Sequence, residues 1–247
     1  MKARTKGWLI ATALTVLSAG CVTSPPAPDF QALVASPDRS EADRANDARR
    51  KPAQLLEFYG VRPGMTALDL GAGTGYNTEL LARAAGAAGR VYAQNTRSMV
   101  DNMLKGRFDE RLQKPVMKNV VHVVREFDDP LPADVRNLDL VTFNFNYHDV
   151  TYMKVDRARM NRAVFDALKP GGIYIVADHS GRPGTGVSEG KSLHRIEEAA
   201  VRREVEAAGF RLVAEGGFLR NPQDSRDAPV FKPKQPNDEF VLKFVKP

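Results

Sequence analysis

Apolar and polar segments alternate along most of the chain and predict strands and helices in turn. Apolar runs of strand length cover residues 65–70, 90–94, 119–124, 138–145, 172–178, 210–219 and 238–245. Helix-like periodicity covers residues 75–86, 97–105, 156–168 and 195–208. This alternation favours an α/β fold, with an open, mostly parallel seven-stranded sheet and helices on both faces. No helix separates the last two strand candidates, so we expect an antiparallel strand near the C-terminus.

Two further segments precede the first strand. Residues 22–40 are rich in Pro, Ser and Ala without a clear period, which is typical of a flexible tether. A helical stretch follows, in which Pro52 can open a second helix and Gly60 can end it. The sequence therefore predicts a tether over residues 21–40 and one folded domain over residues 41–247.

Residues 1–20 have the pattern of an export signal. The basic stretch MKARTKG precedes WLIATALTVL, an apolar run too short to span a bilayer. SAGC then ends at Cys21, the only cysteine of the chain, and resembles a bacterial lipobox, although Ser18 stands where leucine is more usual. We expect cleavage of the signal, lipidation of Cys21 and a location on the periplasmic side of a bacterial membrane. Plain secretory cleavage and an uncleaved anchor are the alternatives.

The charge of the chain does not indicate a nucleic-acid partner. Three of the 36 basic residues lie in the signal, so the mature chain has 33 basic and 30 acidic residues and a net charge of +3. Dense basic tracts with interleaved aromatic residues are absent from the sequence. With a single cysteine, no disulfide within the chain is possible, and the fold depends on its core.

The stretch DLGAGTGYNT, residues 69–78, is the clearest ligand-binding pattern. Glycine at alternate positions after a strand lets the backbone turn sharply and approach a ligand beyond the carboxyl end of that strand. A dinucleotide fingerprint would require glycine at position 76, where Tyr76 stands. A tight strand-to-helix turn without a ligand is the plain alternative.

G-x-G-x-G preceded by LDL resembles the loop of class I, Rossmann-like S-adenosylmethionine-dependent methyltransferases. The later segments VREFDDPLP, NLDLVTFNFNYHDV and LKPGGIYIVADH follow in the order of that family, so the resemblance runs from about Ala53 to the C-terminus. The C-terminal part also resembles a narrower group of exported bacterial predicted methyltransferases of unknown substrate. The resemblance implies S-adenosylmethionine as cofactor.

The resemblance also implies a set of cofactor contacts: Asp69, Gly71, Gly73, Gly75, Tyr76, Asn95, Asp128 and Asn144. Asn95 stands at the end of the second strand, where the family places an acid that accepts hydrogen bonds from both ribose hydroxyls. An amide offers one neutral acceptor, so we expect a weaker grip on the ribose. Asn95 can instead simply begin a turn, and Asp128 can contact adenine or lie in an exposed acidic turn.

The end of the fourth strand, NFNYHDV, supplies the candidate catalytic residues His148, Tyr147 and Asp149. His148 can act as a base or form a pocket wall, and Asp149 can orient its imidazole. The candidate substrate contacts are Asn146, His179, His194 and Arg195. Histidines near Asp178 raise the question of a metal site, but their spacing matches no compact ligand motif, and we expect no metal.

The leading interpretation is S-adenosylmethionine-dependent methyl transfer to an unidentified small-molecule acceptor by an exported lipoprotein. This interpretation has one difficulty: S-adenosylmethionine is made in the cytosol, whereas an exported enzyme folds outside it. The alternative is a lipid-anchored pseudoenzyme or binding protein that holds an envelope metabolite or a partner. A cytosolic enzyme with an uncleaved apolar start is a third possibility. The sequence specifies neither the acceptor nor the oligomeric state.

Overall fold

The computed structural model describes residues 26–231, 233 and 235–247, so the expected signal peptide and Cys21 lie outside the described residues. Its centre is a seven-stranded sheet with the order β3-β2-β1-β4-β5-β7-β6. The strands are β1 (Thr66–Leu70), β2 (Arg90–Asn95), β3 (Val120–Val124), β4 (Leu138–Asn144), β5 (Leu168–His179), β6 (Arg211–Gly216) and β7 (Glu239–Val245). The first five pair in parallel, and β7 runs antiparallel to β5 and β6. The expected fold class is confirmed.

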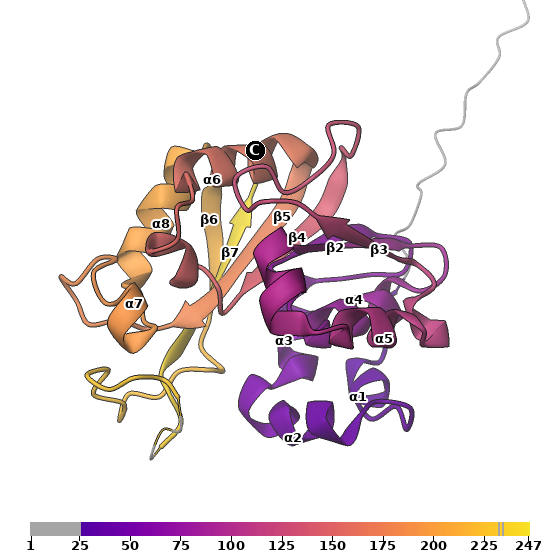
Figure 1. The fold of residues 1–247 in the computed structure, drawn as a ribbon, viewed down its shortest axis with the longest axis horizontal. Helices are drawn as coiled ribbons and strands as arrows, with labels where there is room; N and C mark the ends of the chain where they lie inside the picture. The colour runs from indigo at the N-terminus through magenta and orange to yellow at the C-terminus, as the bar shows by residue number, and fades with distance from the viewer. Residues whose placement is uncertain (1–25, 232, 234) are drawn as a thin grey trace, which may run out of the picture.

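Helices cover both faces of this sheet (Figure 1). They are α1 (Phe30–Val34), α2 (Glu41–Arg50), α3 (Pro52–Tyr59), α4 (Tyr76–Ala85), α5 (Arg107–Leu112), α6 (Arg157–Ala167), α7 (Gly190–Leu193) and α8 (Glu198–Ala207). Short irregular helices are η1 (Met99–Leu104), η2 (Pro115–Met117) and η3 (Asp149–Thr151). The helix expected over 97–105 is a π-helix. The helix expected from 195 begins at Glu198, because Ile196 forms a bridge to Ser180 beside the sheet.

Successive strand residues face opposite layers of the core, as the pleat requires. Ala67 and Leu140 pack in the cluster that α3 and α4 cover. Leu68 and Val141 pack in the cluster that α6 and α8 cover. Both layers are apolar, so the central strands are buried on two faces, which explains their nearly continuous apolar sequence.

The tether expected over residues 21–40 is corrected by the structure over residues 30–40. Phe30, Leu33 and Val34 have helical spacing and pack against the cluster beneath α3 and α4. Arg39 is buried and pairs with Asp47 at 2.6 Å. The folded domain therefore includes α1.

The strand order reverses between β1 and β4, which lie side by side at the centre of the sheet. Ligands of open α/β sheets bind beyond the carboxyl ends of the strands at such a point. The glycine loop follows β1, and the NFNYHDV segment completes β4 and continues beyond it, so the fold brings both to the same place. Among the described helices, none combines the length and the hydropathy that crossing a membrane requires.

Candidate functional site

The loop after β1 has its glycines in the left-handed region, with φ of +66° at Gly71 and +57° at Gly73. The Gly71 amide donates to Oε1 of Gln94 at 2.9 Å. A Cβ built on Gly73 would meet no heavy atom within 4 Å. The loop is thus held from the side of β2 and leaves open space beside its bare backbone, as a ligand cradle requires.

Asn95 supports this loop from beneath. The Gly73 amide donates to its Oδ1 at 2.8 Å, and its Nδ2 lies 3.3 Å from both Gly73 O and His122 Nε2. Because Asn95 is fully buried and both ends of its amide are engaged, the structure corrects its assignment as a direct ribose contact. Asn95 shapes the loop instead.

Asp69 joins β1 to the start of α4. Its carboxylate accepts hydrogen bonds from Thr78 Oγ1 at 2.6 Å, Asn77 Nδ2 at 2.8 Å and Thr142 Oγ1 at 3.0 Å. Burial raises the pKa of Asp69, while these three hydrogen bonds act in the opposite direction. Of the two roles expected for Asp69, this arrangement favours orientation of the loop over contact with a ligand.

Tyr76 connects the loop to helix α2 rather than pointing freely toward a ligand. Its hydroxyl donates to Oδ1 of Asp47 at 2.6 Å, and Asp47 also receives the Arg39 guanidinium. The guanidinium of Arg50 lies 5.4 Å from the centre of the Tyr76 ring. Tyr76 is therefore part of the surface on which α2 docks.

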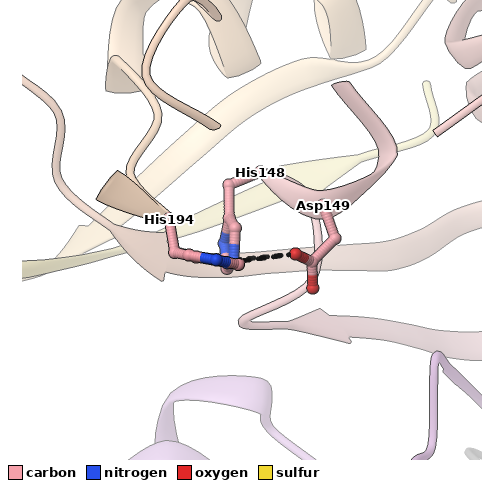
Figure 2. A group of neighbouring side chains, drawn as sticks. All are labelled: His148, Asp149 and His194. Atoms are coloured by element: carbon pink, nitrogen blue, oxygen red, sulfur yellow. Dashed lines mark hydrogen bonds and ion pairs between the residues drawn. The ribbon is translucent and has the colours of Figure 1, made fainter. Parts of the chain in front are cut away.

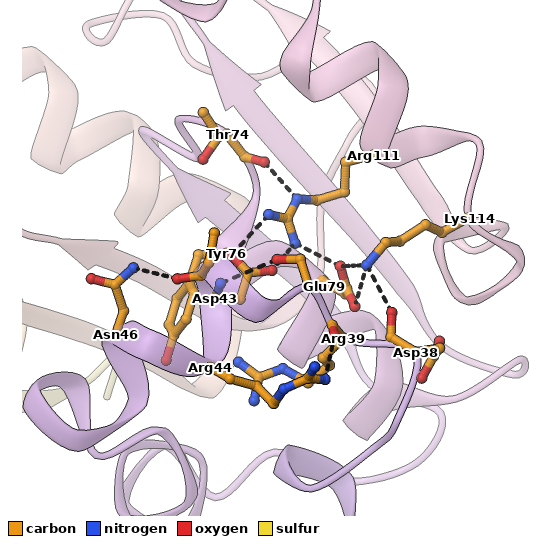
Figure 3. Close-up of polar contacts among 12 residues, drawn as sticks. Asp38, Arg39, Asp43, Arg44, Asn46, Thr74, Tyr76, Glu79, Arg111 and Lys114 are labelled. Atoms are coloured by element: carbon orange, nitrogen blue, oxygen red, sulfur yellow. Dashed lines mark hydrogen bonds and ion pairs between the residues drawn. The ribbon is translucent and has the colours of Figure 1, made fainter.

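A second polar network holds α2 at its other end (Figure 3). Arg111 donates to Thr74 O at 2.7 Å, to Asp43 at 2.7 Å and to Glu79 at 2.6 Å. Lys114 adds a bond to Glu79 at 2.9 Å. Burial opposes the charge of Glu79, but Arg83, Lys114 and Arg111 outweigh it and lower the pKa of the carboxyl. One arginine thereby links α2, the glycine loop and α4.

A cavity of about 590 Å³ lies beyond the carboxyl ends of β2, β3, β4 and β5. It has the size of a small-molecule site. Its lining is mostly apolar with a few convergent polar groups: Arg49, Arg50, Met99, Met103, Phe127, Phe145, Asn146, His148, Asp149, Tyr152, Met153, His179, His194, Val230, Phe231, Pro233 and Asn237. The cavity therefore gathers segments that are far apart in the sequence.

His148 is fixed between two carboxylates at one end of the cavity. Its Nδ1 lies 2.6 Å from Oδ1 of Asp178, and its backbone amide donates to Oδ2 of the same residue at 2.8 Å. Burial opposes the imidazolium, but Asp178 and Asp149 outweigh it and raise the pKa of His148 to about 10. An imidazole that is already protonated near neutral pH cannot accept a further proton, so this environment favours the wall or hydrogen-bonding role over the base.

Asp149 and His194 meet the other ring nitrogen of His148 (Figure 2). His148 Nε2 lies 3.2 Å from Asp149 Oδ1 and 3.3 Å from His194 Nδ1. His194 Nδ1 lies 3.4 Å from the same Asp149 oxygen. These three residues, predicted separately, form one cluster that faces the cavity.

A cation lies at another part of the cavity wall. The Arg50 guanidinium stacks 4.6 Å from the centre of the Phe145 ring, and Phe145 itself has φ of +57°. Burial and the neighbouring Arg49 lower the pKa of Arg50. Arg49 reaches Glu239 at 3.4 Å, whereas no described carboxylate forms an ion pair with Arg50. Arg50 is therefore a candidate partner for an anionic ligand group.

Tyr147 and Arg195 were predicted to contact the substrate, but neither lines the cavity. Tyr147 is fully buried, donates to Glu204 at 2.9 Å and accepts from Asn161 at 2.7 Å. Arg195 is buried and donates to Ala228 O at 2.9 Å and Ser180 O at 3.0 Å. The structure corrects both assignments: Tyr147 packs beneath the sheet, and Arg195 ties the loop between β6 and β7 to the domain.

The remaining predicted residues take varied positions. Asn146 and His179 line the cavity, and His179 Nδ1 lies 3.0 Å from Glu239 Oε1 without the alignment of a hydrogen bond. Asn144 ends β4, and neither polar atom of its amide has a hydrogen-bond partner among the described residues. Asp128 is partly buried in a turn and is not among the cavity residues.

Several cavity residues lay outside the sequence predictions. Arg49 and Arg50 come from the helix before the motif, and Phe231 comes from the long loop before β7. Met99 and Phe127 follow β2 and β3 and supply apolar walls. The signal that could have found Met99 and Phe127 is their position, since residues just after parallel strands meet at one sheet edge.

Comparison with known proteins gives a consistent relationship. A family model described as a methyltransferase domain matches residues 62–210, more than half of the chain. The ubiquinone/menaquinone biosynthesis C-methyltransferase UbiE of Salmonella arizonae is 30% identical over 174 residues, covering 69% of this chain and 66% of that protein. The Vibrio vulnificus protein of the same name is 30% identical over 173 residues, with coverage of 69% and 64%. The chain thus spans slightly less than two thirds of the length of these relatives.

Solved structures share the fold at low identity. A crystal structure of a SAM-dependent methyltransferase from Aquifex aeolicus has a TM-score of 0.61 and 18% identity, covering 89% of this chain and 99% of that one. The crystal structure of the cyclase SpnF has a TM-score of 0.59 and 17% identity, covering 81% of each chain. At such identities the likeness shows the fold alone, and the fold hosts more than one reaction.

Proposed function

This chain belongs to the methyltransferase domain family, in the class I group whose cofactor is S-adenosylmethionine, and from that premise we propose that it methylates an apolar small molecule in the cavity. The bare loop at Gly73 fits the cofactor, because a side chain there would fill the open space. The Asn144 amide at the end of β4 offers a further donor and acceptor. When bound, S-adenosylmethionine supplies an electrophilic methyl group.

The single observation that carries the acceptor class is the apolar rim of the cavity. Phe231, Met103 and Tyr152 are 65%, 61% and 41% exposed, and all three line the cavity. Large apolar side chains exposed together mark a binding surface. Because two relatives are named for quinone biosynthesis, we include hydroquinones among the apolar acceptors to be tested.

The polar and apolar residues of the cavity wall divide between two roles. Arg50 supplies positive charge for the carboxylate of the cofactor, and the apolar side chains of Met99 and Phe127 supply surfaces for a flat ring. The cluster of His148, Asp149 and His194 faces the acceptor and can bind its polar group. Holding both partners in one cavity is the main contribution of the chain to a displacement reaction.

The test uses two glycine variants of the full chain. Gly73→Val fills the open space beside the loop, where φ is +57°. Gly64→Val, before β1, places the same side chain at another position with a positive φ, +85°, and open space around it. We expect at least tenfold weaker S-adenosylmethionine binding by titration calorimetry for Gly73→Val and little change for Gly64→Val. Production of S-adenosylhomocysteine with an apolar acceptor panel then identifies the substrate.

An equal loss of S-adenosylmethionine affinity in both glycine variants would show that the glycine loop is not part of the cofactor site. A wild-type chain that binds no S-adenosylmethionine at millimolar concentration would refute methyl transfer. It would leave the second candidate, a binding protein that uses the same cavity for another metabolite. The observation that favours this candidate is the buried amide of Asn95 where the family places a ribose-binding acid.

We further propose that the protein is exported and anchored by a lipid at Cys21. Support comes from the basic start, the short apolar run and SAGC in the sequence. Expression of wild type and Cys21→Ala, followed by membrane fractionation, tests the anchor. A lipoprotein moves from the membrane to the soluble fraction in the variant, and unchanged fractionation would refute lipidation.

A further inference from the structure

The cluster of His148, Asp149 and His194 has the geometry of a metal site. Its three ligand atoms, two imidazole nitrogens and one carboxylate oxygen, are 3.2, 3.3 and 3.4 Å apart. They form a nearly equilateral triangle that faces the cavity. For an ion about 2.1 Å from each atom, the angle between any two metal–ligand bonds would be about 105°.

This angle distinguishes between types of cation. It is close to the tetrahedral value, whereas one face of an octahedron would bring the same atoms to about 3.0 Å from one another. Two imidazole nitrogens with one carboxylate are a donor set for borderline transition metals rather than for magnesium or calcium. Three protein ligands leave a fourth position for water or a substrate oxygen.

Neighbouring side chains hold His148 and Asp149 in position, as metal sites require. Nδ1 of His148 faces the fully buried carboxylate of Asp178 at 2.6 Å, an arrangement that fixes the ring and frees Nε2 for a metal. Asp178 is itself held by the amides of His148 and His179, each at 2.8 Å. The Tyr152 hydroxyl donates to Oδ1 of Asp149 at 2.5 Å.

Charge balance points the same way. The carboxylates of Asp149 and Asp178 both lie within 3.2 Å of ring nitrogens of His148, and their negative charge is of the sign that a divalent cation compensates. His194 follows the last residue of α7 with φ of +54°, a left-handed conformation that carries some backbone strain in residues other than glycine. Such strain is typical of functional positions.

We propose that His148, Asp149 and His194 bind one divalent transition-metal ion, with zinc the best match, at the acceptor end of the cavity. The site was not predicted from the sequence because 46 residues separate His148 from His194 and only the fold joins them. This metal site does not depend on the proposed methyl transfer, because three side chains of the chain hold the ion without a bound cofactor. Its open position would face whatever molecule occupies the cavity.

The experiment measures zinc binding by the untagged, full-length protein after treatment with a chelator. Calorimetric titration with zinc chloride is expected to show one ion per chain. His194→Ala and Asp149→Asn remove partly exposed ligands and should each weaken binding at least tenfold. His122→Gln removes a histidine outside the cluster and should change the affinity less than twofold. Thermal melting of each metal-free variant confirms that it is folded.

Cobalt provides a second readout that mere loss of stability would not produce. Four-coordinate cobalt absorbs visible light much more strongly than six-coordinate cobalt, so the wild-type chain should become coloured and His194→Ala should not. Absence of zinc binding by the wild type would overturn the proposal. Equal affinities of wild type and both ligand variants, or an equal loss in His122→Gln, would overturn it as well.

Discussion

The Nδ1 of His148 and the Oδ1 of Asp178 lie 2.6 Å apart, and both side chains are almost completely buried. The last residue but one of β5 thereby fixes a side chain that follows β4. A charge-assisted bond of this kind contributes more than a neutral one, because low polarity around it strengthens the attraction.

Asp178→Asn should therefore destabilise the metal-free chain. The two backbone amides donate to separate oxygens of Asp178, so the single amide oxygen of asparagine can accept only one of them, and it cannot neutralise the imidazolium. We expect a loss of about 1.5–3 kcal/mol in the free energy of unfolding. Urea unfolding followed by circular dichroism measures it. Asp134→Asn, an exposed matched control, should stay within about 0.5 kcal/mol of wild type. A stable Asp178→Asn chain would show that the pair is energetically neutral.

Asn95→Asp should weaken the glycine loop although it restores the acid typical of the family. The variant loses the amide donor that faces Gly73 O and places a buried negative charge there, at a cost of about 1–3 kcal/mol. We expect a lower melting temperature and weaker binding of S-adenosylmethionine. Asn102→Asp, on the exposed side of η1, serves as control. Tighter cofactor binding by Asn95→Asp would instead show that residue 95 contacts the ribose directly.

Arg50→Ala should weaken binding of carboxylate-bearing ligands selectively. The guanidinium lacks an ion-pair partner among the described residues and lines the cavity. We expect S-adenosylhomocysteine to bind about tenfold more weakly, a change of about 1.4 kcal/mol. Methylthioadenosine, which lacks the carboxylate, is the control ligand and should bind both chains alike. An equal loss for both ligands would show that Arg50 supports the cavity wall through packing alone.

The network around Arg111 should make stability depend on pH in the acid range. The pKa values of Glu79 and Asp43 are lowered in the folded chain, because the cations outweigh the burial that opposes them. The unfolded chain therefore binds protons first as the pH falls, and stability is lost below about pH 5. Urea midpoints measured between pH 7 and pH 3.5 should fall less steeply in Glu79→Gln than in wild type. An exposed control, Glu110→Gln, should keep the wild-type slope.

The sequence predicts the sheet well because each central strand is apolar on both faces and bounded by turn residues. Its predictions for individual side chains succeed less often, for a geometric reason. Phe145 adopts a left-handed conformation, so the alternation of β4 ends there and Tyr147 turns into the core. Arg195 follows the strained His194 and is directed inward by the carbonyls it binds.

Residues that meet only through the fold were the hardest to predict. His148 and His194 come from separate segments, and neither segment alone indicates that their rings are neighbours. Asp69, by contrast, could be placed at the loop because its partners lie nearby in the chain. Apolar spacing in the segment around Phe30 was too short to distinguish a helix from a tether.

Helix α2 closes one side of the cavity, yet Asp43 is its only buried residue. Asp43 forms an ion pair with Arg111 of α5, Asp47 accepts a hydrogen bond from Tyr76, and α2 joins α3 through Lys51, whose φ is +45°. Dissolved salt screens charged contacts but strengthens apolar ones, so it acts in opposite directions on α2 and on the core. We therefore expect added salt to weaken the hold on α2, which contributes Arg49 and Arg50 to the cavity wall, more than it weakens the sheet that carries the site.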